Sequence, residues 1–179
     1  VYLYIGDYAE SMNNLKYAVS FSNSDNYTKA AAYENMGYIQ ALKGVFEEAL
    51  NFTKKSLNIY EKLSSASGKA STSLNLGWIE SYLGNYDKAL NNYLISLKNY
   101  EIVNDNIGQG RALNNIGLIY RKLHNLDKAL EYYNSCYKLG LELNDKQLIA
   151  GSLNNKGNIL KEQKNYDMAL ENYKKALQL

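Results

Sequence analysis

Apolar residues recur along the chain at spacings that place them on one side of an α-helix. Between residues 107 and 123, Leu113, Ile116, Leu118, Ile119 and Leu123 recur at helical spacing. Such a period is typical of amphipathic helices and differs from the strict alternation of a half-buried strand. Proline is absent, and Val and Ile are sparse beside Leu, Lys and Asn. The pattern predicts an all-α fold.

The same pattern returns every 40 residues. Three columns carry one residue type in four consecutive units: Asn35, Asn75, Asn115 and Asn155; Gly37, Gly77, Gly117 and Gly157; Ala49, Ala89, Ala129 and Ala169. A fixed period of this length indicates stacked structural repeats, each burying its apolar face against its neighbours.

Each unit is expected to contain two helices. The first helices are predicted at 27–43, 67–83, 107–123 and 147–163, and the second helices at 46–63, 86–103, 126–143 and 166–179. The links are only two or three residues long, so the paired helices must be antiparallel. Asp105 and Asp145, with Ser65 in the same register, are expected N-caps of first helices. Residues 8–22 supply a second helix without a full first one.

The repeats divide the chain into one expected repeat domain, 1–179. It comprises a partial unit, 1–26, followed by units at about 27–66, 67–106, 107–146 and 147–179. The chain lacks an initiator Met and shows no polar capping helix after the last unit. Because a solenoid needs capped ends, we expect this chain to be a fragment of a larger protein.

Close packing explains the glycine and alanine columns, since two helices approach closely only where side chains are small. Gly77 and Ala89 are expected on facing surfaces of one hairpin. Large aromatic side chains are expected to fill the adjacent layer, and the set is Tyr86, Tyr93, Tyr100, Tyr133, Tyr166 and Tyr173.

These residues resemble the tetratricopeptide repeat family, whose pattern is matched by Leu113, Ile116-Gly117, Tyr120, Ala129 and Tyr133. The family repeats every ~34 residues, whereas this chain repeats every 40 and lacks the closing Pro. This longer variety is similar to the repeats of kinesin light chains, of spindle-orientation adaptors and of bacterial sensors and regulators. The resemblance implies a right-handed superhelical solenoid of about four full units plus a partial one.

Composition argues against most catalytic and nucleic-acid functions. The net charge is only +2, far from the concentrated basic excess of a nucleic-acid binder. His124 and Cys136 are the only histidine and cysteine, and no metal-ligand spacing occurs. Gly108-Gln109-Gly110 lacks the lysine and the preceding strand of a phosphate loop. We therefore expect no catalysis, cofactor, metal, nucleic acid or membrane span, and a cytoplasmic location.

The resemblance implies that the first helices line a concave groove. The register then gives the candidate ligand-binding residues: Asn35, Tyr38, Asn75, Trp78, Arg111, Asn114, Asn115, Arg121, Asn154, Asn155, Asn158 and Lys161. A carboxamide both donates and accepts, so the asparagine column is suited to a peptide backbone. The column is also suited to bonding neighbouring helices and holding the stack in register. Trp78 is either a groove anchor or a core residue.

The predicted function is a protein- or peptide-binding scaffold module. Arg111, Arg121, Lys122 and Lys161 favour an acidic ligand end near units four and five, with an apolar end near Tyr38 and Trp78. Glu34, Glu80 and Glu162 would oppose this field if they faced the groove. One alternative is the sensor or regulatory repeat region of a bacterial signalling enzyme, such as a histidine kinase or response-regulator phosphatase, with catalysis in a missing domain. A second is a structural spacer or self-association unit.

Overall fold

A computed structural model describes residues 8–21 and 25–179, and it contains nine helices and no strand in that part of the chain. The expected turn at Gly6-Asp7 and the end of the predicted helix 8–22 fall at least partly outside the described residues. The helices are α1 (Tyr8–Ser20), α2 (Asn26–Leu42), α3 (Phe46–Lys62), α4 (Ala66–Tyr82), α5 (Tyr86–Ile102), α6 (Asn106–Lys122), α7 (Leu126–Leu143), α8 (Lys146–Glu162) and α9 (Tyr166–Leu177). The predicted bounds agree with these to within about two residues.

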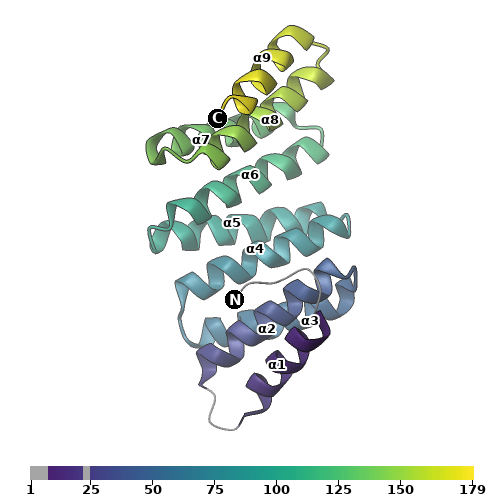
Figure 1. The fold of residues 1–179 in the computed structure, drawn as a ribbon, viewed down its shortest axis with the longest axis vertical. Helices are drawn as coiled ribbons and strands as arrows, with labels where there is room; N and C mark the ends of the chain where they lie inside the picture. The colour runs from purple at the N-terminus through teal and green to yellow at the C-terminus, as the bar shows by residue number, and fades with distance from the viewer. Residues whose placement is uncertain (1–7, 22–24) are drawn as a thin grey trace.

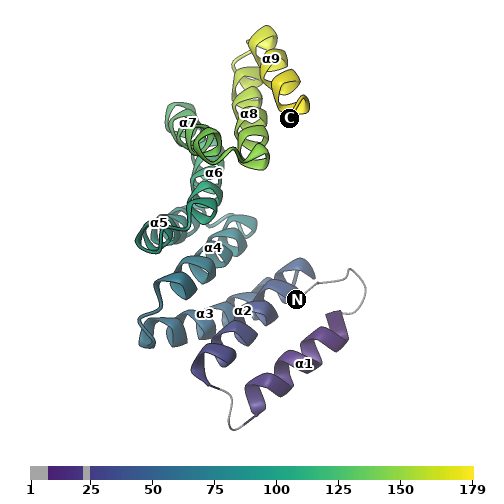
Figure 2. The ribbon, with the colours of Figure 1, turned by 60° about the vertical axis from the view of Figure 1, so that its left-hand side comes forward.

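The helices form antiparallel hairpins that stack into an elongated solenoid (Figure 1). The hairpins are α2–α3, α4–α5, α6–α7 and α8–α9, and each second helix packs on the first helix of the next hairpin. α1 packs on α2 as a second helix would. Successive hairpins are rotated relative to one another, as a view turned by 60° makes clear (Figure 2). The expected superhelical solenoid is therefore confirmed.

The first and second helices occupy different sides of the stack. α2 contacts α4, α4 contacts α6, and α6 contacts α8, whereas α3, α5 and α7 make no contact with one another. Elements on the inner side of a curved stack lie closer together than those on the outer side. The first helices therefore form the inner side, which we call the concave face, and the second helices form the convex face.

The glycine column marks the closest approach within each hairpin. A Cβ atom built on Gly117 would lie 2.6 Å from the Tyr133 ring, and Gly77 and Gly157 meet Tyr93 and Tyr173 in the same way. Ala89 is fully buried, but the nearest neighbour of Gly77 is the Tyr93 ring, not Ala89.

The predicted tyrosine layer is only partly correct. Tyr93, Tyr100 and Tyr133 are buried. Tyr166, however, is 63% exposed, so its assignment to the core is wrong. It begins α9, and no following helix among the described residues covers it.

Local chemistry sets the helix ends. The side chains of Asp105 and Asp145 accept hydrogen bonds from the third backbone N–H of α6 and α8, at 2.9 Å in both cases, and Ser65 caps α4 at 3.2 Å. These three predicted N-caps are confirmed. The residue that closes each turn has a positive φ, with Gly44, Gly84, His124 and Lys164 at equivalent positions. These turn positions therefore share a backbone conformation, although their side chains differ.

Candidate functional site

The asparagine column lies between adjacent first helices on the concave face. The Nδ2 of Asn75 on α4 donates to Glu34 of α2 at 3.1 Å, and the Nδ2 of Asn155 on α8 donates to Asn114 of α6 at 2.7 Å. Asn35, in the first full unit, instead donates to the Ala31 carbonyl of its own helix at 3.0 Å. Two of the four amides thus link one unit to the next.

Asn115 departs from this scheme for a reason visible in the repeat. The residue equivalent to Glu34 and Asn114 in the preceding unit is Leu74, which has no acceptor on its side chain. Asn115 is half-buried, and its amide has no hydrogen-bond partner among the described residues. The side-chain oxygens of Asn35, Asn75 and Asn155 likewise receive no hydrogen bond in the described part of the chain. Each asparagine therefore keeps an open acceptor.

Aromatic rings form a continuous ladder beside this column, from the C-terminal ends of α2 and α4 to Phe46 at the start of α3. The Tyr38 and Trp78 ring centroids are 5.9 Å apart, those of Trp78 and Tyr82 5.2 Å, and those of Tyr82 and Phe46 5.8 Å. Tyr82 is 64% exposed, while Tyr38 and Trp78 are half-buried. Trp78 is thus packed between two rings and still open to solvent on part of its surface.

Basic residues occupy the C-terminal half of the same face. Arg111 and Lys161 are exposed, as are Asn154 and Lys122, and a recess of about 180 Å³ includes Arg111, Asn114 and Gly151 in its lining. A second recess of about 300 Å³ is lined by Arg121, Asn158, Lys161 and Glu162. The two recesses lie towards opposite ends of α6 and α8, on either side of the Asn114–Asn155 pair.

Two contacts reduce the freedom of these groups. Arg121 lies 3.8 Å from Glu162, so part of its charge is neutralised within the molecule. Asn158 accepts a hydrogen bond from the Tyr173 hydroxyl at 2.9 Å, which fixes its orientation. Arg111, Lys122 and Lys161 form no ion pair within the described residues.

The three glutamates flagged in the sequence lie in different environments. Glu34 is half-buried between α2 and α4, and Glu162 pairs with Arg121. Glu80 is buried and accepts a 2.7 Å hydrogen bond from Asn85, the N-cap of α5. It therefore turns towards the second helices, and the expectation that it would oppose the groove field is not met.

Groups with catalytic potential are held in structural positions. His124 is exposed in the α6–α7 turn with a φ of 57°. Cys136 is buried, its Sγ donates to the Gly110 carbonyl at 3.4 Å, and burial raises the pKa of the thiol to about 11. Within residues 8–21 and 25–179, no cluster of His, Cys, Asp or Glu has the arrangement of a metal site.

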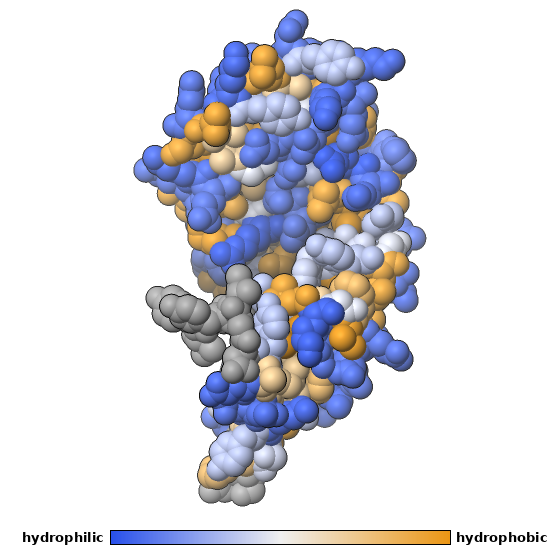
Figure 3. Space-filling view, turned by 45° about the vertical axis from the view of Figure 1, so that its right-hand side comes forward, coloured by the Kyte–Doolittle hydropathy of each residue, from blue (hydrophilic) through white to orange (hydrophobic). Residues whose placement is uncertain are grey.

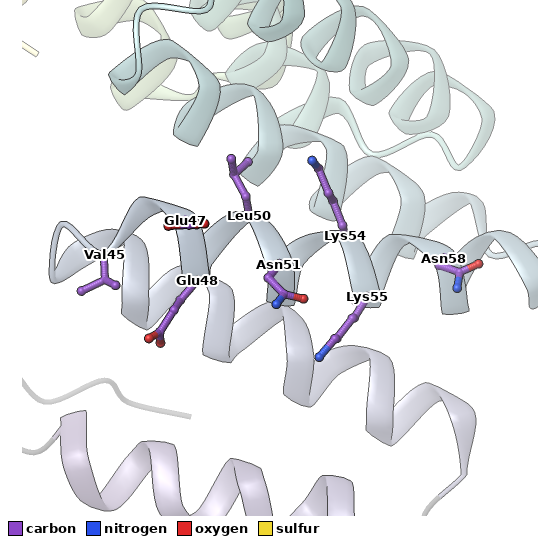
Figure 4. Close-up of a pocket in the computed structure, with 8 residues that line it drawn as sticks. All are labelled: Val45, Glu47, Glu48, Leu50, Asn51, Lys54, Lys55 and Asn58. Carbon is purple, nitrogen blue, oxygen red and sulfur yellow. The ribbon is translucent and has the colours of Figure 1, made fainter.

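A further recess lies on the convex face. It measures about 730 Å³ and is lined by α3 and its N-cap, with Glu47, Glu48, Lys54 and Lys55 among the lining residues (Figure 4). Two acidic residues lie near the start of α3 and two basic residues lie about two turns further along it, so the recess has no net charge. Its side chains also point in different directions, some towards α4 and α5 and others towards α1 and α2. We therefore place the candidate site on the concave face.

The surface in Figure 3 shows hydrophilic residues predominating in its upper part and hydrophobic residues gathering at the height of α2 to α4. The asparagines, Tyr38, Trp78 and the basic residues remain predicted groove residues, and the sequence analysis did not single out Tyr82 and Phe46, whose rings extend the aromatic ladder. The register gave no signal for Tyr82, because Leu42, Lys122 and Glu162 hold the equivalent positions.

No helix in the described part of the chain combines the length and apolarity that crossing a bilayer requires.

Comparisons with known proteins agree on the fold. The solved structures that resemble this chain include a signal transduction ATPase with numerous domains, from Pyrococcus horikoshii, which carries a tetratricopeptide repeat sensor; its TM-score is 0.84 at 25% identity, over 92% of this chain and 25% of that one. BtubC from P. vanneervenii gives a TM-score of 0.81 at 17% identity, over 94% of this chain and 69% of that one. A Rap protein complexed with competence and sporulation factor gives 0.81 at 17% identity, over 93% of this chain and 47% of that one.

No curated protein matches the chain in sequence. This chain spans about a quarter of the P. horikoshii ATPase and less than half of the Rap protein. The family model described as tetratricopeptide repeat matches residues 28–102 and 108–179, which together make up most of the sequence. With its stacked hairpins and its glycine and alanine columns, the chain belongs to the tetratricopeptide repeat family.

Proposed function

We propose that this chain binds a polypeptide along the concave face, as a module of a larger regulatory or scaffold protein. The observation that carries the proposal is the row of asparagine acceptors, one on each first helix, that no group in the described part of the chain satisfies. Asn75, Asn115 and Asn155 are half-buried and Asn35 is exposed, and polar groups become more costly to leave without a partner as they lose contact with water. An extended backbone presents N–H groups at regular intervals, and a row of carboxamides is suited to accept them whatever the ligand sequence.

The asparagines serve two roles in this account. The Nδ2 atoms of Asn75 and Asn155 hold adjacent units together, while the side-chain oxygens are left for a ligand. The two interpretations of the column, ligand binding and register, are thus compatible. Asn115 is the exception because both ends of its amide are open, and we expect it to contribute most to binding.

The side chains on this face favour a ligand whose two ends differ in chemistry, one acidic and the other apolar or planar. Arg111, Lys122 and Lys161 lie on α6 and α8 and favour carboxylates. The aromatic ladder on α2 and α4 favours an apolar or planar side chain. The ligand is therefore expected to place its acidic end near α6 and α8, and its binding should weaken as salt is added.

A second candidate function is the sensor region of a signalling enzyme whose catalytic domain lies elsewhere. It is favoured by the similarity to the P. horikoshii ATPase, a protein with a tetratricopeptide repeat sensor, over 92% of this chain. Both candidates require the concave face to hold a ligand. They differ only in what the ligand controls.

The experiment is a pull-down from a proteome with the isolated chain, with Asn115→Ala and Asn134→Ala as the two variants. Asn134 is exposed on α7, a second helix, so it is the matched control. We expect Asn115→Ala to reduce capture of specific polypeptides and Asn134→Ala to leave it unchanged. A spacer function predicts no specific capture, and equal loss in both variants would contradict the groove assignment.

A further inference from the structure

Glu34 is a half-buried carboxylate in the groove wall with no cation beside it. It lies on α2 and accepts a hydrogen bond from Asn75 of α4 at 3.1 Å. The ion pairs among the described residues are Arg121–Glu162 and Glu171–Lys175, and neither involves Glu34. The hydrogen bond that it accepts comes from the neutral amide of Asn75, and the nearby side chains of Ser71 and Thr72 are neutral hydroxyls. A charged group removed from water is normally paired with an opposite charge.

The backbone position of Glu34 lies one helical turn from the aromatic ladder. Glu34 precedes Tyr38 by four residues on α2, and Asn75 precedes Trp78 by three on α4. Residues three or four apart on a helix are neighbours on one face. The Glu34–Asn75 pair and the Tyr38–Trp78 pair are therefore successive layers of the same groove wall, about one helical turn of 5.4 Å apart.

These two layers together select a particular ligand chemistry. An aromatic side chain would contact the rings and leave Glu34 unpaired, and an ammonium ion would pair with the carboxylate but offer little planar surface. A guanidinium group is planar and stacks on aromatic faces, and its fork of donors matches a carboxylate. Asn75 occupies one acceptor position of Glu34, and the carboxylate has further lone pairs to offer.

We propose that Glu34, Tyr38 and Trp78 form a subsite for the arginine side chain of the bound polypeptide. This inference rests on the proposed function and refines it. The part of the groove beside the aromatic ladder then binds a side chain with an apolar stem and a cationic end. The ligand is bipolar: its arginine lies between α2 and α4, and its carboxylates lie between α6 and α8. Burial raises the pKa of the Glu34 carboxyl, so a bound cation relieves a cost that the free protein carries.

The first test uses small probes that carry only the proposed arginine group. They lack the acidic end of the proposed polypeptide ligand, so they report on this subsite alone. N-acetylarginine amide and N-acetylcitrulline amide have nearly the same shape and differ in charge. Trp78 is the only tryptophan, so its fluorescence reports directly on this subsite. We expect saturable changes with the arginine probe at millimolar concentrations, at least tenfold weaker changes with the citrulline probe, and loss of the difference in Glu34→Gln. Equal responses to both probes in the unsubstituted protein would overturn the subsite.

Glu34→Gln is a suitable variant because its side-chain oxygen still accepts from Asn75. Glu61→Gln is the matched control, since Glu61 is exposed on α3. A melting temperature of Glu34→Gln at or above that of the unsubstituted protein establishes that the fold is intact. A preference for arginine that persists in Glu34→Gln contradicts the assignment.

The second test separates this subsite from the proposed function. Octapeptides span up to ~28 Å when extended, and a set of them carries arginine or citrulline at one end and two aspartates at the other, in both orders. The proposal predicts that arginine strengthens binding by about tenfold to a hundredfold, as for a hydrogen bond between charged groups, and that Glu34→Gln removes the gain. If arginine and citrulline peptides bind equally and Asn115→Ala weakens both, the groove function stands and the arginine subsite fails.

Discussion

At the scale of single residues, small side chains are required where helices meet and are merely tolerated elsewhere. Gly117 lies against the fully buried Tyr133 ring, whereas a Cβ on Gly151 of α8 would meet no atom within 4 Å. The equivalents of Gly151 are Ala31, Ser71 and Arg111, so the column accepts side chains of any size.

The two glycines give a matched pair of substitutions. Gly117→Ala is expected to lower the free energy of unfolding by about 1–3 kcal/mol, because the ring or the helix must shift to admit the methyl group. Gly151→Ala should raise it by about 0.5–1 kcal/mol, because alanine is the better helix former. Urea denaturation of both variants checks this. A change of the same sign in both would contradict the close-contact assignment.

Glu34 provides a prediction about pH. Burial raises the pKa of its carboxyl above the ordinary value of about 4.5, and the hydroxyls of Ser71 and Thr72 offset part of the rise. The native state therefore holds the proton more tightly than the unfolded chain, and the contribution of Glu34 to stability falls as pH rises from about 4.5 through the native pKa.

Glu34→Gln should consequently be more stable than the unsubstituted protein at pH 7, by up to about 1 kcal/mol. The advantage should shrink towards pH 4, where both side chains are neutral. Melting temperatures measured across this range, with Glu61→Gln as the control, test the sign. A variant that is less stable at pH 7 would show that Glu34 contributes favourably to the fold as a charged group.

At the scale of elements, the α–α turns within the hairpins share a residue with a positive φ, but that residue is glycine in only some of them. Gly44 and Gly84 close their α–α turns with a φ of 76°, and His124 closes the next one with a φ of 57°. Side chains other than glycine are strained in this conformation. The only histidine of the chain thus takes a position that favours glycine.

Replacement of His124 by glycine should raise the free energy of unfolding by about 0.5–1 kcal/mol, since release of strain outweighs the greater freedom of the unfolded chain. The reverse change, Gly84→His, should lower it by a similar amount. Thermal unfolding followed by circular dichroism measures both. Destabilisation by His124→Gly would indicate that the imidazole forms a contact on which the turn depends.

The helices could be predicted because their signals are local. N-caps such as Asp105 and Asp145 and the fixed 40-residue period define the start and spacing of each element. The groove contacts were harder because they join residues 41 apart, such as Asn75 with Glu34. Which partner faces each asparagine depends on the rotation between units. Glu80 is turned towards the second helices by a local contact with Asn85 within its own hairpin, whereas Glu34 lies at a different register position and contacts the next unit.

At the scale of the whole molecule, the stack separates two surfaces with different chemistry. The concave face carries open amides, an aromatic ladder and unpaired basic groups, and the convex recess on α3 carries two acidic and two basic residues. Curvature brings the first helices into contact and spreads the second helices apart. A ligand lying across several units on the concave side therefore meets a continuous surface.

The most direct test of this account is site-specific photo-crosslinking from each face. A benzophenone amino acid replaces Asn154, which is exposed on α8, or Asn134, which is exposed on α7. Irradiation in the presence of the captured polypeptide should give crosslinks from position 154 and none from position 134, and Asn115→Ala should reduce the yield. Crosslinks that form from position 134 alone, or equally from both, would contradict the claim that the concave face is the binding surface.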